Sequence, residues 1–346
     1  MLPIKSLPTD IWPLIAECLP SQDILNICCT SKALHQLCLP NLYHQIDLSH
    51  PNISALTDKE PHNTNPFNQP KDSSAVDAIR SQQLQFMPHI LRKSPENAKY
   101  VKSLTWAHVT DVRLYRPWNV DILRTFTALD RVRRLDIYAS KTSTLRPNGH
   151  LDLFPRATHI RLAGHMSRDW VSAILLGREK ADLHSLILGV EIYSSDPRQP
   201  RSPTIPASEV QALASELRPR CNKLEYLGLQ GIVQEGEPSN KYSKFGDWAR
   251  FIEILQPQRL NVWCAKQGPL EYQALQSDQE LYQEEAREKA FCEYIRPVLL
   301  RGWPSLKAIK IYGIHAESIE SESPGGVQVS VDDSMDHCGR WQGLPL

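Results

Sequence analysis

Residues 7–47 read LPTDIWPLIAECLPSQDILNICCTSKALHQLCLPNLYHQID and carry the most specific signals in the chain. Thr9 can cap a first helix, and Leu19-Pro20-Ser21 ends that helix and opens a second one. Thr30-Ser31 opens a third, which Pro40 is expected to end. The apolar positions recur at helical spacing: Ile11, Leu14, Ile15 and Cys18, then Ile24, Leu25 and Cys28 as the buried face of the second helix, then Leu34 and Leu37.

Three helices in about 40 residues bury too little surface to be stable on their own. The outward apolar residues Leu7, Pro8, Leu19, Pro20 and Leu39 therefore indicate a docking surface for a partner. The alternative is that these helices begin a larger domain and that the same residues pack internally.

This stretch resembles an F-box, and its sequence is close to the fungal form of that motif. The resemblance covers about an eighth of the chain and rests on Leu7-Pro8, Ile11, Ile15, Leu19-Pro20, Asp23-Ile24-Leu25, Cys29-Thr30-Ser31-Lys32, Leu34, Leu37 and Leu42-Tyr43. Cys29 and Tyr43 stand where Val and Trp are common, and both keep an apolar or aromatic body. The resemblance implies docking on the Skp-type adaptor of a cullin-RING ubiquitin ligase. The adaptor-binding candidates are Leu7, Pro8, Ile11, Ile15, Leu19, Pro20, Ile24, Leu34 and Leu37.

The composition is that of a globular protein without an electrostatic preference for nucleic acid or membrane. The 346 residues exceed the usual size of one core, and 39 basic residues balance 39 acidic ones. No apolar run approaches a membrane span, and prolines and acids interrupt the first twenty residues. We therefore expect an intracellular protein, cytoplasmic or nuclear, whose cysteines are small buried hydrophobes.

Four segments are expected along the chain. Residues 1–48 form the F-box domain, and residues 49–80 form a proline-rich and polar linker or loop. Residues 81–316 form the substrate-binding domain, which a helix with Leu84, Met87 and Leu91 opens. Residues 317–346 form a tail whose Ser, Gly and acidic content predicts disorder.

A loose repeat runs through the larger domain. Its copies start at residues 101, 132, 157, 183, 224, 257 and 306, and each contains an alternating segment typical of a half-buried strand. Amphipathic helices are predicted between the strands, with stripes at Ile122/Phe126/Leu129, Val171/Ile174/Leu175, Val210/Leu213/Leu217 and Trp248/Phe251/Ile252/Leu255. Residues 278–300 are expected to form a longer helix.

Alternating strands and helices predict an α/β fold with parallel strands. The Leu-x-x-Leu-x-Leu core resembles leucine-rich repeats, but the spacing is irregular and the Asn or Cys expected after it is missing. We expect an irregular, leucine-rich-repeat-like solenoid, with a doubly wound sheet as the alternative. The order of the strands in space distinguishes the two.

No catalytic constellation stands out, so the expectation is a non-enzymatic protein without cofactor or metal. His337-Cys338 beside Asp336 is a poor metal site, because two adjacent ligands lie in a flexible segment. Outward positions of the strands instead predict a protein-binding face. The substrate-binding candidates are Arg134, Asp136, Arg161, Lys307 and Lys310.

The resulting hypothesis is a substrate-recognition subunit of an SCF-type ubiquitin ligase. The F-box would bind the Skp-type adaptor, and through it a cullin, while the repeat domain would hold an unknown protein. The alternative is an interaction scaffold that takes no part in ubiquitin transfer.

Overall fold

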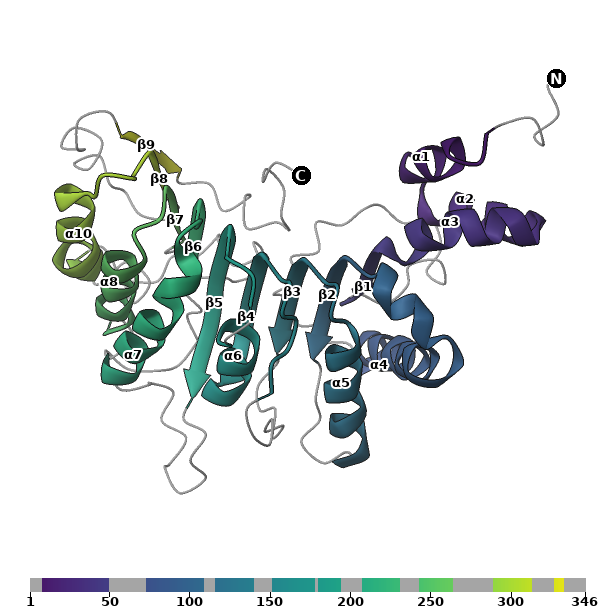
Figure 1. The fold of residues 1–346 in the computed structure, drawn as a ribbon. Coiled ribbons are helices and arrows are strands. Elements are labelled where there is room, and N and C mark those ends of the chain that lie inside the picture. The colour runs from purple at the N-terminus through teal and green to yellow at the C-terminus, as the bar shows by residue number, and fades with distance from the viewer. Residues whose placement is uncertain are drawn as a thin grey trace, which may run out of the picture.

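Three helices form a head at one end of the protein. The computed structural model describes residues 8–49, 73–108, 116–139, 151–177, 180–193, 207–230, 243–263, 289–312 and 327–332. The head consists of α1 (Ile11–Glu17), α2 (Ser21–Thr30) and α3 (Lys32–His44), which confirms the three predicted helices. It stands beside one end of a long sheet (Figure 1). No residue separates α3 from the first strand, β1 (Gln45–Leu48), so the head runs directly into the sheet.

Two details of the head differ from expectation. Asp10, not Thr9, is the N-cap of α1, and its side chain makes no capping hydrogen bond. Pro40 lies inside α3 instead of ending it. The last turn of α3 is held by packing, since Leu42 contacts the core of the head and Tyr43 contacts the core of the sheet domain. These contacts outweigh the backbone hydrogen bond that proline cannot donate.

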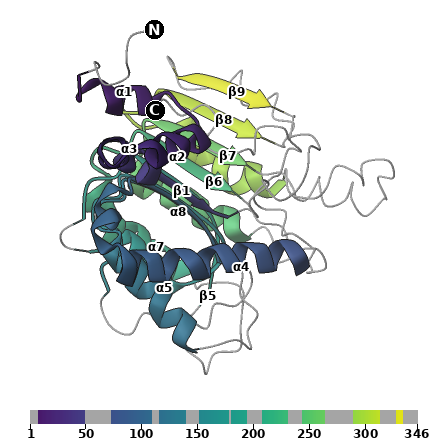
Figure 2. The ribbon, with the colours of Figure 1, turned by 90° about the vertical axis from the view of Figure 1, so that its right-hand side faces the viewer.

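The sheet has nine strands, all parallel, and their order in space is their order in sequence. β1 is followed by β2 (Ser103–His108), β3 (Arg134–Ala139), β4 (His159–Ser167), β5 (Ser185–Tyr193), β6 (Tyr226–Gln230), β7 (Arg259–Trp263), β8 (Ala308–Tyr312) and β9 (Gln328–Asp332). Figure 1 shows the labelled strands in this order from the head to the C-terminal end of the sheet, and Figure 2 looks along the same row with the head in front. A doubly wound sheet reverses its order at a switch point, which this sheet does not do. The predicted solenoid of alternating strands and helices is therefore confirmed.

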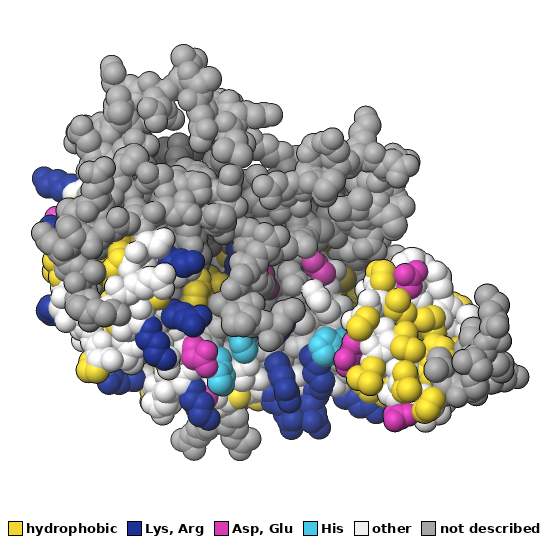
Figure 3. All heavy atoms as spheres, turned by 90° about the horizontal axis from the view of Figure 1, so that it is seen from above, with side chains coloured by type: hydrophobic (Ala, Val, Ile, Leu, Met, Phe, Trp, Pro, Cys, Tyr) yellow, Lys and Arg dark blue, Asp and Glu magenta, His cyan; other side chains and the backbone are white. Residues whose placement is uncertain are grey.

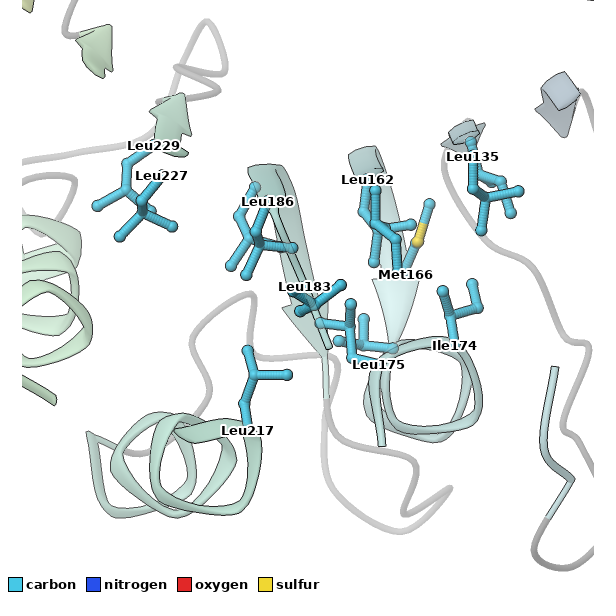
Figure 4. Close-up of a cluster of buried hydrophobic side chains, with 14 of the residues drawn as sticks. Leu135, Leu162, Met166, Ile174, Leu175, Leu183, Leu186, Leu217, Leu227 and Leu229 are labelled. Atoms are coloured by element: carbon cyan, nitrogen blue, oxygen red, sulfur yellow. The ribbon is translucent and has the colours of Figure 1, made fainter. Parts of the chain in front are cut away.

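The core lies between the sheet and its helices. Alternate strand residues point toward α5 (Arg116–Ala128), α6 (Arg168–Leu175), α7 (Ala207–Leu217) and α8 (Ser243–Leu255). Leu135, Leu162, Leu186 and Leu227 extend into one layer that Ile174 of α6 and Leu217 of α7 meet (Figure 4). The four predicted helical stripes all contribute to this core. Toward the C-terminus, η8 (Phe291–Ile295) and α10 (Arg296–Arg301) confirm helix within residues 289–301.

Two elements depart from the expected segment boundaries. α4 (Ser73–Pro88) begins inside the expected linker and continues into η3 (His89–Lys93) and η4 (Pro95–Tyr100). It covers the β1 end of the sheet, where Gln83 donates to the carbonyls of Leu48 (2.9 Å) and Ala107 (2.7 Å). β9 lies within the tail for which composition predicted disorder. That expectation is wrong for residues 328–332, because Val329 packs against the core beside β8.

Candidate protein-docking sites

The head has a very small core of its own. Ala16, Ile24, Cys28 and Cys38 are its buried hydrophobic residues, and a few half-buried side chains pack around them. Burial raises the pKa of the Cys28 and Cys38 thiols, which keeps them in the neutral form that suits a core. Because this core is so small, the head needs contacts with the sheet domain or with another protein to be stable.

The head also exposes large apolar side chains. Leu14 is 61% exposed, Leu25 is 43% exposed and Ile11 is 36% exposed. Figure 3 shows hydrophobic side chains gathered on the face of the head seen from above, with acidic side chains at the margin. We call Ile11, Leu14 and Leu25 the apolar head surface. Leu25 was expected in the buried face of the second helix, and that expectation is wrong, because α3 covers Ile24 and Cys28 instead.

The predicted adaptor-binding residues differ in their exposure. Leu7 lies outside the described residues, and Pro8, Ile11 and Pro20 are exposed. Ile15, Leu19, Leu34 and Leu37 are half-buried, and Leu19 and Leu37 pack against the head core. Ile24 is only 4% exposed, so the expectation that its side chain is available to a partner is wrong. Leu14 and Leu25 were missing from the predicted set, although the helical spacing of Ile11 and Leu14 already placed the two on one stripe.

The predicted substrate-binding residues also separate. Asp136 and Arg161 are 8% and 4% exposed, lie opposite each other in the β3–β4 register, and pair at 3.6 Å between carboxylate and guanidinium atoms. The expectation that they line an open face is therefore wrong for these two. Arg134 is half-buried at the start of β3, and Lys310 is exposed on β8. Lys307, just before β8, is exposed and donates to the Gln258 side chain at 2.7 Å.

Sequence reasoning missed a set of cations beside Arg134. Lys102, Arg131, Arg133 and Arg156 lie in the turns that lead into β2, β3 and β4. The repeat pattern could have found them, because Lys102 and Arg133 occupy equivalent positions in the first two copies.

Within the described ranges, no group of three or more His, Cys, Asp or Glu side chains is placed to hold a metal ion. The candidate at Asp336, His337 and Cys338 lies outside those ranges. No described helix combines the length and the apolar composition needed to span a membrane.

The small core and the apolar head surface are properties of a domain that works by docking. Residues 4–49 match the F-box-like family model. The match ends one residue beyond β1, so it covers the three helices and the strand that joins them to the sheet. The chain thus carries an F-box-like domain at its N-terminal end. A search of curated proteins found no relative that matches this chain.

Proposed function

We propose that this protein is a substrate-recognition subunit of an SCF-type ubiquitin ligase. In this proposal the F-box-like head binds a Skp-type adaptor and, through it, a cullin. The sheet domain, a solenoid similar to leucine-rich repeats, holds the protein to be modified. The subunit itself is non-catalytic and acts by proximity, because holding a protein near the ubiquitin-carrying enzyme raises its effective concentration.

The apolar head surface is the observation that supports this proposal most directly. Three of the six most exposed large hydrophobic residues in the described part of the chain lie on the head: Ile11, Leu14 and Leu25. Exposed apolar side chains on a small helical unit favour burial against another protein, because burial removes their apolar surface from water.

Replacing two apolar side chains of the apolar head surface by carboxylates tests adaptor docking. Leu14→Asp with Leu25→Asp places two carboxylates in the contact, and we expect adaptor binding to weaken by about 2 kcal/mol or more. The measurement is calorimetric titration of the full chain with a purified Skp-type adaptor. Leu84→Asp is the control, because Leu84 is 51% exposed on α4, outside the three helices of the head. Equal affinity of the double variant and the unchanged protein would overturn the proposal. The pair Leu7→Ala and Pro8→Ala extends the same test to the start of the head.

The scaffold alternative is tested in cells. Under the ligase proposal, the full chain co-purifies with both adaptor and cullin, and removal of the head, residues 1–44, makes the bound protein accumulate. A chain that recruits the adaptor without a cullin, and whose partners keep their abundance after the deletion, is instead an interaction scaffold.

A further inference from the structure

Basic side chains gather where three neighbouring strands begin. Lys102 precedes β2, Arg131 and Arg133 precede β3, Arg134 opens β3, and Arg156 lies in the turn before β4. We call these five residues the basic edge. They belong to separate repeats, yet the parallel register brings them to the same end of the sheet.

Backbone hydrogen bonds hold the basic edge in place. The ladder continues one residue before the strands, since the amides of Arg133 and Arg134 donate to the carbonyl of Lys102 at 2.8 and 3.0 Å. The amide of Thr158 donates in turn to the carbonyl of Arg133 at 2.9 Å. Neighbouring strands lie about 4.8 Å apart, so the starts of β2, β3 and β4 span roughly 10 Å. The cations therefore project from a rigid backbone.

The charges of the basic edge are largely uncompensated. Arg131, Arg133 and Arg156 are exposed, and Lys102 and Arg134 are half-buried. Asp130 is the adjacent acid, 3.8 Å from the guanidinium group of Arg131. Within the described part of the chain, Arg133, Arg134 and Arg156 form no ion pair.

The repulsion within the basic edge acts on Lys102. Partial burial lowers the pKa of Lys102, and the charges of Arg131, Arg133 and Arg156 lower it further, against the opposing effect of Asp130. A protein with as many acids as bases has thus concentrated cations at one edge, where three arginines disfavour the charged form of Lys102. An anionic ligand relieves this repulsion.

The basic edge is short. His159, the first residue of β4, stacks on His184, which precedes β5, with 5.9 Å between the ring centroids, and Glu225, which precedes β6, lies 3.5 Å from His184. An acid thus closes the row on that side. The head lies beyond the β2 end of the basic edge. Figure 3 shows Lys and Arg side chains on the same upper face as the hydrophobic side chains of the head.

We propose that the basic edge binds a short acidic segment of a partner protein. A guanidinium group donates two parallel hydrogen bonds to a carboxylate, and four of the five cations are arginines. An extended peptide advances about 3.3 Å per residue, so roughly three or four residues cover the distance from β2 to β4. This fit favours a peptide over a nucleic acid, which is bound along longer basic tracks with exposed stacking aromatics.

This inference rests on the proposed function in one respect, because the partner is then the protein that the ligase subunit holds. The proposal of adaptor docking and the proposal of acidic-peptide binding can be refuted independently. Adaptor docking involves the apolar head surface, whereas acidic-peptide binding involves the starts of β2 to β4. A variant of one surface is therefore a control for the other.

Binding of a fluorescein-labelled oligoglutamate peptide to the full chain tests the inference by fluorescence anisotropy. Arg133→Glu with Arg156→Glu reverses two exposed cations of the basic edge, and we expect the affinity to fall about tenfold or more. Arg124→Glu with Arg250→Glu is the matched control, because it changes the net charge equally at exposed positions on α5 and α8. The control variant should bind the peptide with an affinity within about twofold of that of the unchanged protein. Added salt should weaken peptide binding by the same factor in both proteins.

Three results would overturn the inference. The first is no binding of oligoglutamate to the unchanged protein, and the second is an equal loss in both double variants, which indicates a general charge effect. The third is tighter binding of a single-stranded oligonucleotide that the Arg133→Glu/Arg156→Glu variant loses. Adaptor titration with that variant should match the unchanged protein, which shows that its head is intact.

Discussion

Arg220 is a buried cation that joins three parts of the sheet domain. It is 8% exposed, and its guanidinium group donates to the carbonyls of Ala181, Leu175 and Ala157, each at 2.7 Å. Leu175 ends α6, where helix carbonyls lack partners within the helix and a positive charge is favourable. Burial lowers the pKa of Arg220 to about 10, which leaves the side chain charged at neutral pH.

Removal of this guanidinium group should destabilise the fold strongly. Arg220→Met leaves three buried carbonyls without their donor, and we expect the free energy of unfolding to fall by about 3 kcal/mol. Arg218→Met is the control, because the exposed Arg218 makes one hydrogen bond, to the carbonyl of Ile254 at 2.9 Å, and should cost about 1 kcal/mol or less. Urea unfolding of both variants measures the difference, and equal losses would contradict this role of Arg220.

His108 should make the protein sensitive to acid. Its ring lies beside Trp170, with 6.4 Å between ring centroids, and complete burial lowers its pKa from 6.5 to about 4. Between these values the unfolded chain binds a proton that the folded chain does not, so stability falls as the pH falls from 6.5 to 4. The full effect is about 3 kcal/mol.

A substitution isolates this contribution of His108. His108→Gln should flatten the dependence of unfolding free energy on pH between 4 and 6.5, measured by urea unfolding at several pH values. His35→Gln, at an exposed position of α3, should keep the slope of the unchanged protein. A slope that survives in His108→Gln would place the acid sensitivity elsewhere.

At the scale of the elements, β4 depends on a glycine. Gly164 has a φ of +87° and lies opposite Ala139 of β3, where an added Cβ would stand 1.9 Å from the Ala139 carbonyl oxygen. Gly164→Ala must therefore shift the β3–β4 pairing, and we expect a loss of about 2–4 kcal/mol.

Gly246 provides the opposite case. It lies inside α8, where a Cβ would make ordinary contacts with Tyr294 at 3.6 Å. Gly246→Ala should leave stability unchanged or raise it by up to about 1 kcal/mol, because alanine favours helix. Thermal unfolding compares the two substitutions, and similar effects at both positions would contradict the strain argument for β4.

The elements that sequence predicted and those that it missed differ in their local signals. β2 to β8 each contain apolar residues at alternate positions, which depend only on which face of the sheet is covered. β1 has four residues and follows α3 without a break, so helix and strand merge in sequence. β9 has the same alternation at Val329 and Val331, but its polar surroundings masked the pattern. α4 ends at Pro88, and the chain continues from there as the π-helical turn η3.

The candidate sites were harder to predict because they depend on the register between strands and on which side chains the neighbouring elements bury. Alternation places Asp136 and Arg161 on one face, but only the β3–β4 register makes them partners across 25 positions in sequence. Periodicity likewise groups Ile11 with Leu14 without showing which side of α1 the rest of the head covers. The basic edge becomes visible only when three turns are brought together by the sheet.

At the scale of the whole molecule, the junction between head and sheet sets the orientation of the docking surfaces. Tyr43, near the end of α3, shares a 2.6 Å hydrogen bond with the His89 ring, and the two rings stack at 5.9 Å. The amide of Lys102 also donates to the carbonyl of His44 at 2.9 Å, so the basic edge and the head share one backbone connection. The small head core implies that these junction contacts supply much of the stability of the head.

Loss of the Tyr43 ring should therefore release the head without unfolding the sheet. In Tyr43→Ala we expect faster amide hydrogen exchange throughout α2 and α3, whereas the central strands β4 and β5 keep their protection. Tyr294→Ala, which removes a 39% exposed ring at the other end of the molecule, should leave exchange in the head unchanged. Mass spectrometry of peptides from exchanged protein measures both regions at once. If head and central strands lose protection together, the head is not a separately releasable unit, and its orientation is set by the whole sheet rather than by the Tyr43–His89 contact.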